Sequence, residues 1–212
     1  MPILEIFGIP ASNYVWTARM ACAEKGVAYE LKPAGPHTPE IDAIHPMGRM
    51  PVMRHGEACL FETAAICTYI DRFFPGPGLV PSGALAAAEA AQWVSFINTS
   101  LDPACVRRYA LGYFFPGTPD GSPNRAKIDP AIAGVEKHLG IIDRAVAKTG
   151  HLVGTNFTIA DMFLMPIARY LTKLPESSEM IGKLPALTAY IGRHSSRASF
   201  VASRPPPLAK TA

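Results

Sequence analysis

Three neighbouring polar side chains near the start of the chain are able to take part in chemistry. Ser12, Asn13 and Tyr14 follow an apolar run and a Gly-Ile-Pro break, and a segment with helical spacing begins among them. A hydroxyl at a helix start can donate a hydrogen bond to a bound anion, beside the free N–H groups and the positive end of the helix dipole. The same hydroxyl can instead simply cap the helix. The residues alone leave both roles open for Ser12.

Two further segments carry groups suited to holding a small polar molecule. Glu62 and Thr63 precede an amphipathic segment, where free N–H donors of a helix start bind carboxylates. Capping alone would also explain these two residues. Met50-Pro51 begins a predicted strand, which is either an ordinary edge position for proline or a place where an extended ligand pairs with the backbone.

The apolar periodicity predicts the elements that position these residues. Gly26 stands where a helix-ending glycine belongs, and His55-Gly56-Glu57 forms the turn of a predicted hairpin. The expected order is β-α-β, a turn-rich crossover with one short helical turn, then β-β-α. Its segments are a strand at 3–7, a helix at 13–25, a strand at 27–32, strands at 51–53 and 58–61, and a helix at 62–74.

The rest of the chain is expected to be helical. A proline- and glycine-rich linker at 76–83 separates an α/β domain at 1–75 from an all-helical domain at 84–204, and 205–212 is expected to form an extended tail. One helix is predicted to begin at residue 84. After a loop at 116–123, a second helix runs to about residue 148, a third begins at Thr158 and a last one begins near Pro185. Thr158 and Asp161 form a capping box, a folding feature that we exclude from the active site.

Composition narrows the function classes. The 212 residues are 49% hydrophobic and 17% charged with a net charge of +3, and Arg107-Arg108 is the only adjacent basic pair, so no nucleic-acid surface is expected. The apolar stretches are too short for a membrane helix, and no secretory signal is seen, which favours a cytoplasmic protein. The four cysteines show no metal-like spacing, so we expect reduced thiols and no metal.

The motifs together resemble the cytosolic glutathione transferase superfamily, in a form closest to the bacterial, serine-type theta and phi classes. Four pieces carry the resemblance in order: "PASNYV", "HPMGRMPVM", "LFETAAICTYI" and "FTIADMFLMP". The resemblance covers essentially the whole chain. It implies an α/β plus all-α architecture, with an N-terminal thioredoxin-like domain that binds glutathione and a C-terminal all-helical domain. It also implies a homodimer and glutathione as co-substrate.

The resemblance assigns roles along the tripeptide. Pro51 would follow a cis peptide bond, which presents the backbone of Met50 to the cysteinyl residue of glutathione. Thr63 would hold the α-carboxylate of the γ-glutamyl end, and Glu62 would meet its ammonium group. The glycine carboxylate would be met by His37 or Arg49, with His45 as a further candidate.

The resemblance also implies how the thiol is activated. A free thiol has a pKa near 8.5, so bringing it to about 6.5 takes about 2.7 kcal/mol of differential stabilisation. In theta-class enzymes the catalytic serine lies fourteen residues before the glycine that matches Gly26, which indicates Ser12. Asn13 and Tyr14 are weaker alternatives. The tyrosine used by other classes would fall nearer Phe7 and Gly8, so that route is closed.

The expected reaction is thiolate attack on an apolar electrophile. Candidate residues for the co-substrate pocket are aromatic and lie in the first helix and early in the helical domain: Tyr14, Trp93, Tyr109, Tyr113 and Phe114. Reduction of disulfides or peroxides with glutathione is a second possibility. A non-catalytic binding or regulatory protein of the same fold is a third, which the retained glutathione-binding residues disfavour.

Overall fold

The computed structural model describes residues 2–206 and divides into two compact units. The first unit contains the chain up to Pro81 together with the segment that begins at Ser196, and the second contains Ser82–Ser195. The extended tail expected at 205–212 falls mostly on residues 207–212, which lie outside the described residues.

The first unit is built on a four-stranded sheet with the order β2-β1-β3-β4. β1 (Leu4–Phe7) pairs in parallel with β2 (Tyr29–Lys32) and antiparallel with β3 (Val52–His55), which pairs antiparallel with β4 (Ala58–Phe61). The helix α1 (Asn13–Lys25) supplies the crossover between the parallel strands β1 and β2. This is the predicted thioredoxin-like arrangement.

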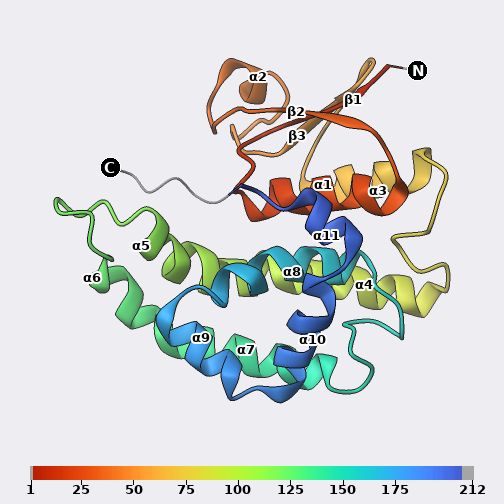
Figure 1. Ribbon diagram of the computed structural model, residues 1–212. Helices are drawn as coiled ribbons and strands as arrows, with labels where there is room; N and C mark the ends of the chain where they lie inside the picture. Colours follow the sequence, from red (N-terminus) through yellow and green to blue (C-terminus); the bar gives the residue numbers. More distant parts are fainter. Residues whose placement is uncertain (1, 207–212) are drawn as a thin grey trace. The chain divides into compact units, whose positions relative to one another are not determined.

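The two faces of the sheet bury different side chains because neighbouring residues of a strand point to opposite sides. Phe7 and Val52 are paired and pack with Ile41 of α2 (Pro39–Asp42) on one face. Their neighbours Ile6 and Met53 are also paired and fully buried, and they point to the opposite face. α1 and α3 (Thr63–Phe73) lie side by side along that opposite side of the sheet in Figure 1.

α1 begins and ends where its sequence predicts. Ser12 is the N-cap, and Gly26 ends the helix with a left-handed φ of 66°, which glycine adopts without steric cost. Lys25, the buried last residue of α1, donates from Nζ to the carbonyl oxygens of Asp71 (3.0 Å) and Gly76 (3.3 Å). The Asp71 carboxylate in turn accepts from the N–H of Leu79 at 2.8 Å. The predicted linker is therefore fastened to the first unit over this stretch.

The end of the described chain returns to the first unit, which corrects the predicted domain boundary at 204. α11 (Ala198–Ser203) packs against α1, where Phe200 stacks on Trp16 with ring centroids 4.7 Å apart. The helical pattern of this segment is too short to indicate which domain its apolar side will contact. The burial of Phe200 against an α1 side chain decides the placement, because it removes two large aromatic surfaces from water.

The second unit is all helical, as predicted, with more breaks than the sequence pattern shows. A π-helical segment, η1, continues directly from α4 and contains Pro103, whose missing N–H cannot support regular α-helical bonding. The elements are α4 (Ala84–Phe96), η1 (Ile97–Ala110), α5 (Leu111–Phe114), α6 (Arg125–Ile128), η2 (Asp129–Ala131), α7 (Ile132–Val146), α8 (Ile159–Leu171), α9 (Pro175–Gly182) and α10 (Pro185–Ser195).

α8 forms the core of this unit. All of its residues except Arg169 and Tyr170 are buried. The predicted capping box is present at its start: the Thr158 side chain caps the helix, and the Asp161 carboxylate accepts from the Thr158 N–H at 2.9 Å. Asp161 also accepts from the N–H of Leu152 (3.0 Å) and the hydroxyl of Tyr190 (3.1 Å), so it joins α8, the preceding loop and α10.

Candidate functional site

The strand register brings the predicted binding segments to one end of the sheet. Phe7 is paired with Val52, and Val52 is paired with Phe61. The residues beyond this row are therefore the β1–α1 turn with Ser12, the start of β3 with Met50-Pro51, and the β4–α3 junction with Glu62-Thr63. β2 ends at the same row, because Lys32 is paired with Phe7, and its crossover carries His37 and Arg49.

Ser12 immediately precedes α1, and its hydroxyl lies at the N-terminal end of that helix. Its Oγ accepts from the N–H of Val15 at a long 3.5 Å, and its carbonyl oxygen accepts from the N–H of Trp16 at 2.9 Å. In the capping bond the Ser12 hydroxyl is the acceptor, so its proton is not used there. Capping by a lone pair and donation of the proton to a bound anion are thus compatible on the same oxygen.

Gly8 shows how closely the β1–α1 turn approaches the segment before Pro51. A Cβ at Gly8 would lie 2.4 Å from Cγ2 of Val15 and 3.4 Å from Cβ of Met50. The Ile9 N–H also lies 3.2 Å from the Met50 sulfur, which it approaches as a donor. The turn that carries Ser12 and the backbone of Met50 are therefore neighbours in space.

The peptide bond between Met50 and Pro51 is cis, as the family resemblance predicted. Pro51 is buried, Met50 is half-buried and the preceding Arg49 is exposed. Pro51 directly precedes β3, the strand paired with β1 and β4. The backbone of Met50 therefore lies between the β1–α1 turn on one side and the β4–α3 junction on the other.

Glu62 and Thr63 form a sharp corner between β4 and α3. Glu62 has a φ of 65°, unusual for a residue with a side chain, and Thr63 begins the helix with 6% of its surface exposed. Helix starts leave backbone N–H groups without intrahelical partners, so this corner can receive a carboxylate. The side chain of Glu62 is exposed beside it.

His45, the further candidate to meet the glycine carboxylate, is buried in the structure. It is 6% exposed, its Nδ1 accepts from the N–H of Met47 at 3.0 Å, and its Nε2 lies 3.8 Å from Oε1 of Glu62. Its ring also contacts that of Phe61. His45 therefore links the loop before Met50 to the Glu62 corner, a role that no spacing in the sequence signals.

His37 and Arg49 remain the exposed basic residues of the crossover that were predicted to meet a carboxylate. His37 has a φ of 59°, its N–H donates to the Gly48 carbonyl oxygen at 3.0 Å, and its ring lies 3.7 Å from the Asp42 carboxylate. The His37–Gly48 bond brings the two ends of the crossover together. His37 and Arg49 are thereby close along the folded crossover although twelve positions separate them in sequence.

The predicted co-substrate residues divide between the two units. Tyr14 belongs to the first unit, whereas Trp93, Tyr109, Tyr113 and Phe114 belong to the second. Tyr14, Trp93, Tyr113 and Phe114 are half-buried, but Tyr109 is fully buried. The expectation that Tyr109 lines an open pocket is corrected here: helical spacing of aromatic residues does not separate an interior face from a pocket face.

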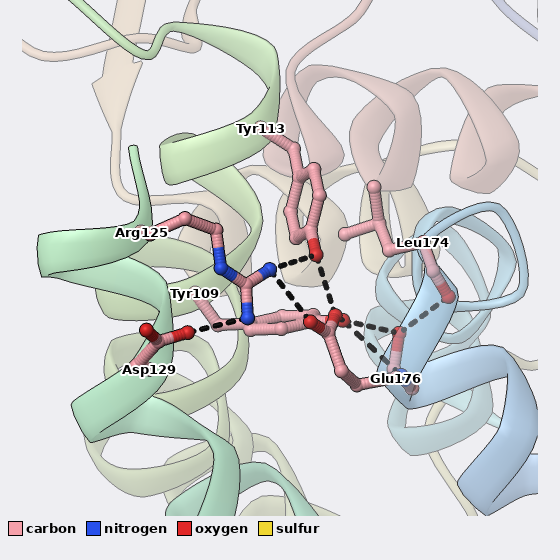
Figure 2. Close-up of polar contacts among 7 residues, drawn as sticks. Tyr109, Tyr113, Arg125, Asp129, Leu174 and Glu176 are labelled. Carbon is pink, nitrogen blue, oxygen red and sulfur yellow. Dashed lines mark hydrogen bonds and ion pairs between the residues drawn. The ribbon is translucent and has the colours of Figure 1, made fainter. Parts of the chain in front are cut away.

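Tyr109 and Tyr113 are both fixed by Glu176 of α9 (Figure 2). The Tyr109 hydroxyl donates to Oε2 of Glu176 at 2.9 Å and the Tyr113 hydroxyl donates to the same oxygen at 2.5 Å. Arg125 donates to Oε1 of Glu176 at 2.7 Å and to the Tyr113 oxygen at 3.0 Å, and it also pairs with Asp129. This network joins η1, α5, α6 and α9.

The charges of this network perturb its pKa values. Partial burial works to raise the pKa of Glu176, but hydrogen bonds from Tyr113 and Arg125 outweigh it and lower the pKa to about 2. Burial and the nearby Glu176 carboxylate raise the pKa of Tyr113. Both groups therefore keep one protonation state at neutral pH, which suits a structural clamp rather than proton transfer.

The thiols and possible metal ligands do not form a second reactive centre. Burial raises the pKa of Cys22 and of Cys105 to about 12 and raises that of Cys67 further, whereas Cys59 on β4 is exposed. Within residues 2–206, no cluster of three or more histidine, cysteine or acidic side chains is arranged to hold a metal ion. In the same range, no helix is long and apolar enough to span a membrane.

The fold is a thioredoxin-like domain with the candidate binding segments at one end of its sheet, followed by a helical domain. Comparison with known families gives the same division: residues 6–78 match the glutathione S-transferase N-terminal domain, and residues 90–198 match its C-terminal domain. The chain belongs to the glutathione S-transferase family.

Individual relatives differ in how much of this chain they match. Glutathione S-transferase 1 of Triticum aestivum is 27% identical over 189 residues, which cover 82% of each protein. Elongation factor 1-gamma 1 of Oryza sativa is 28% identical over 141 residues, 64% of this chain and 32% of that protein. The crystal structure of glutathione transferase F7 from Populus trichocarpa has a TM-score of 0.85 and 25% identity, covering 95% of this chain and 97% of that one.

Proposed function

We propose that the protein is a glutathione transferase that joins the glutathione thiolate to a small apolar electrophile, with Ser12 as the residue that stabilises the thiolate. The observation that carries this proposal is the meeting of Ser12, cis Met50-Pro51 and Glu62-Thr63 at one end of the sheet. Membership of the glutathione S-transferase family and the similarity to named transferases support the same activity.

The width of the site fits an extended tripeptide. β1, β3 and β4 are consecutive in the sheet, so the ends of β1 and β4 are two strand spacings, about 9.5 Å, apart. Three extended residues span about 10 Å. An extended tripeptide can therefore reach from Glu62-Thr63 across Met50 toward the β1–α1 turn that carries Ser12.

Each charged group of glutathione would meet a protein group of opposite charge or a hydrogen-bond donor. Thr63, at the start of α3, would receive the α-carboxylate with its N–H and hydroxyl, and the exposed Glu62 carboxylate would meet the ammonium group. His37 or Arg49 would meet the glycine carboxylate from the crossover. The backbone of Met50 would pair with the cysteinyl residue in the manner of an added strand.

Chemistry would follow from the protonation state of the bound thiol. The thiol proton is released to water, and the Ser12 hydroxyl donates a hydrogen bond to the sulfur anion beside the positive end of α1. The sulfur electron pair then forms a bond to the electrophilic carbon, and a leaving group such as chloride departs with its own bonding pair. Ser12 donates a hydrogen bond throughout and does not need to ionise.

The finer assignments belong to this proposal as well. Tyr14, Trp93, Tyr113 and Phe114 are the candidates to contact the electrophile, and their partial exposure is compatible with that role. We also propose a theta- or phi-like class, a homodimer and a cytoplasmic location. Light scattering at several protein concentrations tests the dimer: a mass near 45.6 kDa, twice the 22.8 kDa chain, is expected, and a constant monomer mass would contradict it.

A non-catalytic role is the second candidate, because the chain also resembles part of an elongation factor subunit. Binding to immobilised glutathione, followed by an assay with 1-chloro-2,4-dinitrobenzene and one with an organic peroxide, separates the possibilities. A transferase binds glutathione and consumes the aryl chloride. Turnover of the peroxide alone would indicate a reductase, and a folded protein that fails to bind glutathione would indicate an interaction module.

A further inference from the structure

The C-terminal helix α11 contacts α1 one turn after the proposed catalytic serine. Trp16 is 1% exposed, and its indole Nε1–H donates to the Ser203 hydroxyl oxygen at 3.0 Å. Phe200 stacks on the same indole with ring centroids 4.7 Å apart and planes inclined by 28°. Ser203 donates its own hydroxyl proton to the Ser199 carbonyl oxygen at 2.6 Å, which leaves the oxygen lone pairs directed to Trp16.

The backbone of Trp16 is in turn hydrogen-bonded to Ser12, one helical turn earlier in the chain. The Trp16 N–H donates to the Ser12 carbonyl oxygen at 2.9 Å, the first bond of α1. Ser203 and Phe200 therefore fix the indole, the indole fixes the backbone of Trp16, and this backbone holds the Ser12 carbonyl. The contact therefore reaches Ser12 through a single hydrogen bond within the first turn of α1.

We propose that Trp16, held by Ser203 and Phe200, is a positioning residue that fixes the direction of the Ser12 hydroxyl toward the glutathione sulfur. The inference rests on the proposed function, since it assigns a support to the residue that activates the thiol. A hydrogen bond from Ser12 to sulfur stabilises the thiolate only if donor and sulfur are aligned, because hydrogen bonds weaken steeply with angle. A loosened first turn of α1 would then raise the pKa of the bound thiol.

The opposite end of the α1–α11 contact supplies a matched control. Glu24 lies three turns farther along α1, about 18 Å from Ser12 at 1.5 Å per residue. It pairs with Arg197, with 2.7 Å between Glu24 Oε2 and an Arg197 nitrogen, and it also accepts from the Ser199 hydroxyl. Glu24→Gln weakens the same helix contact without touching the turn that contains Ser12.

The experiment measures kcat/KM for glutathione as a function of pH in the full chain. Trp16→Phe keeps an aromatic ring on Phe200 but removes the indole donor, and Ser203→Ala removes the acceptor. For both variants we expect kcat/KM near neutral pH to fall about threefold, with the acid limb of the profile moved to higher pH. Ultraviolet titration of bound glutathione should show the thiolate forming at a correspondingly higher pH. Glu24→Gln should leave both curves in place even where urea unfolding shows an equal loss of stability.

Two outcomes would overturn the positioning role. One is an unchanged pH profile for Trp16→Phe and Ser203→Ala. The other is an equal displacement for Glu24→Gln, which would make the contact a matter of general stability. Ser203→Ala combined with Ser12→Ala should add no further displacement, because the effect acts through Ser12. If Ser12→Ala alone leaves the pKa of the bound thiol unchanged, the role of Ser12 in the proposed function is wrong. If Ser12→Ala raises this pKa and Ser203→Ala does not, only the positioning role of Trp16 is wrong.

Discussion

Replacement of Asp161 by alanine should severely destabilise the helical unit. Asp161 is 0% exposed and accepts from the backbone N–H groups of Thr158 and Leu152 and from the hydroxyl of Tyr190. It therefore satisfies donors from the helix start, the preceding loop and α10 with one carboxylate. Burial and the charge of Asp161 also raise the pKa of Tyr190 well above its usual value, so this hydroxyl stays a donor.

The size of the effect follows from the number of bonds. A hydrogen bond to a charged group contributes about 1.5–3 kcal/mol, and a buried donor left without a partner carries its own penalty of about 1–3 kcal/mol. The Thr158 hydroxyl also donates to Asp161, at a longer 3.3 Å. All of these bonds share one carboxylate, so their losses do not simply add. We expect the free energy of unfolding to fall by about 3–5 kcal/mol for Asp161→Ala, a large part of the stability of a typical domain.

Urea unfolding followed by far-ultraviolet circular dichroism measures this loss. The protein concentration is kept constant because assembly alters apparent stability. Tyr190→Phe, which removes only one of the donors, should lose about 1–2 kcal/mol. A loss below about 1 kcal/mol for Asp161→Ala would refute the reasoning, since it would mean that the carboxylate does not join the three segments.

Three further predictions concern other parts of the chain. The pKa of Glu176 lies near 2 rather than at its ordinary 4.5, so its contribution to stability should be complete above about pH 4.5 and be lost as the pH falls toward 2; acid unfolding of Glu176→Gln should lack that component. The native protein should react with a thiol reagent at one cysteine, Cys59, and Cys59→Ser should abolish the reaction; modification of a second thiol without unfolding would contradict the burial of the others. Gly8→Ala places a Cβ 2.4 Å from Cγ2 of Val15, so we expect the free energy of unfolding to fall by about 1–3 kcal/mol and the transferase activity to fall with it. Wild-type values in both assays would contradict the close approach.

Much of the fold of the first unit could be predicted from short stretches of sequence. Ser12 and Gly26 have strong and well-defined preferences for the two ends of a helix, so the bounds of α1 could be predicted to the residue. The capping box of Thr158 and Asp161 is equally local, because both partners lie within one turn. Such features depend on a few neighbouring residues and are therefore visible in the sequence.

Long-range packing could not be predicted in this way. Nothing near Phe200 shows that it stacks on Trp16, so the sequence pattern assigns residues 196–204 to the helical domain, whereas the structure places them in the first unit. Tyr109 has the same helical spacing as residues that face a pocket, but Glu176 and Ser177 enclose its hydroxyl. The sequence likewise does not separate His45 from the exposed His37 and Arg49 of the same crossover, although His45 is buried and lies 3.8 Å from the Glu62 carboxylate.

The most direct test of the central claim is ultraviolet titration of glutathione bound to the wild-type protein and to Ser12→Ala. At saturating glutathione, the wild-type protein should form the thiolate at a pH about two units below that of the free thiol, and Ser12→Ala should move this transition back toward the free value, with turnover reduced at least about tenfold. Affinity for glutathione should change little, because Met50, Glu62 and Thr63 remain in place. Superimposable titration curves for the two proteins would contradict the assignment of Ser12 as the residue that stabilises the thiolate.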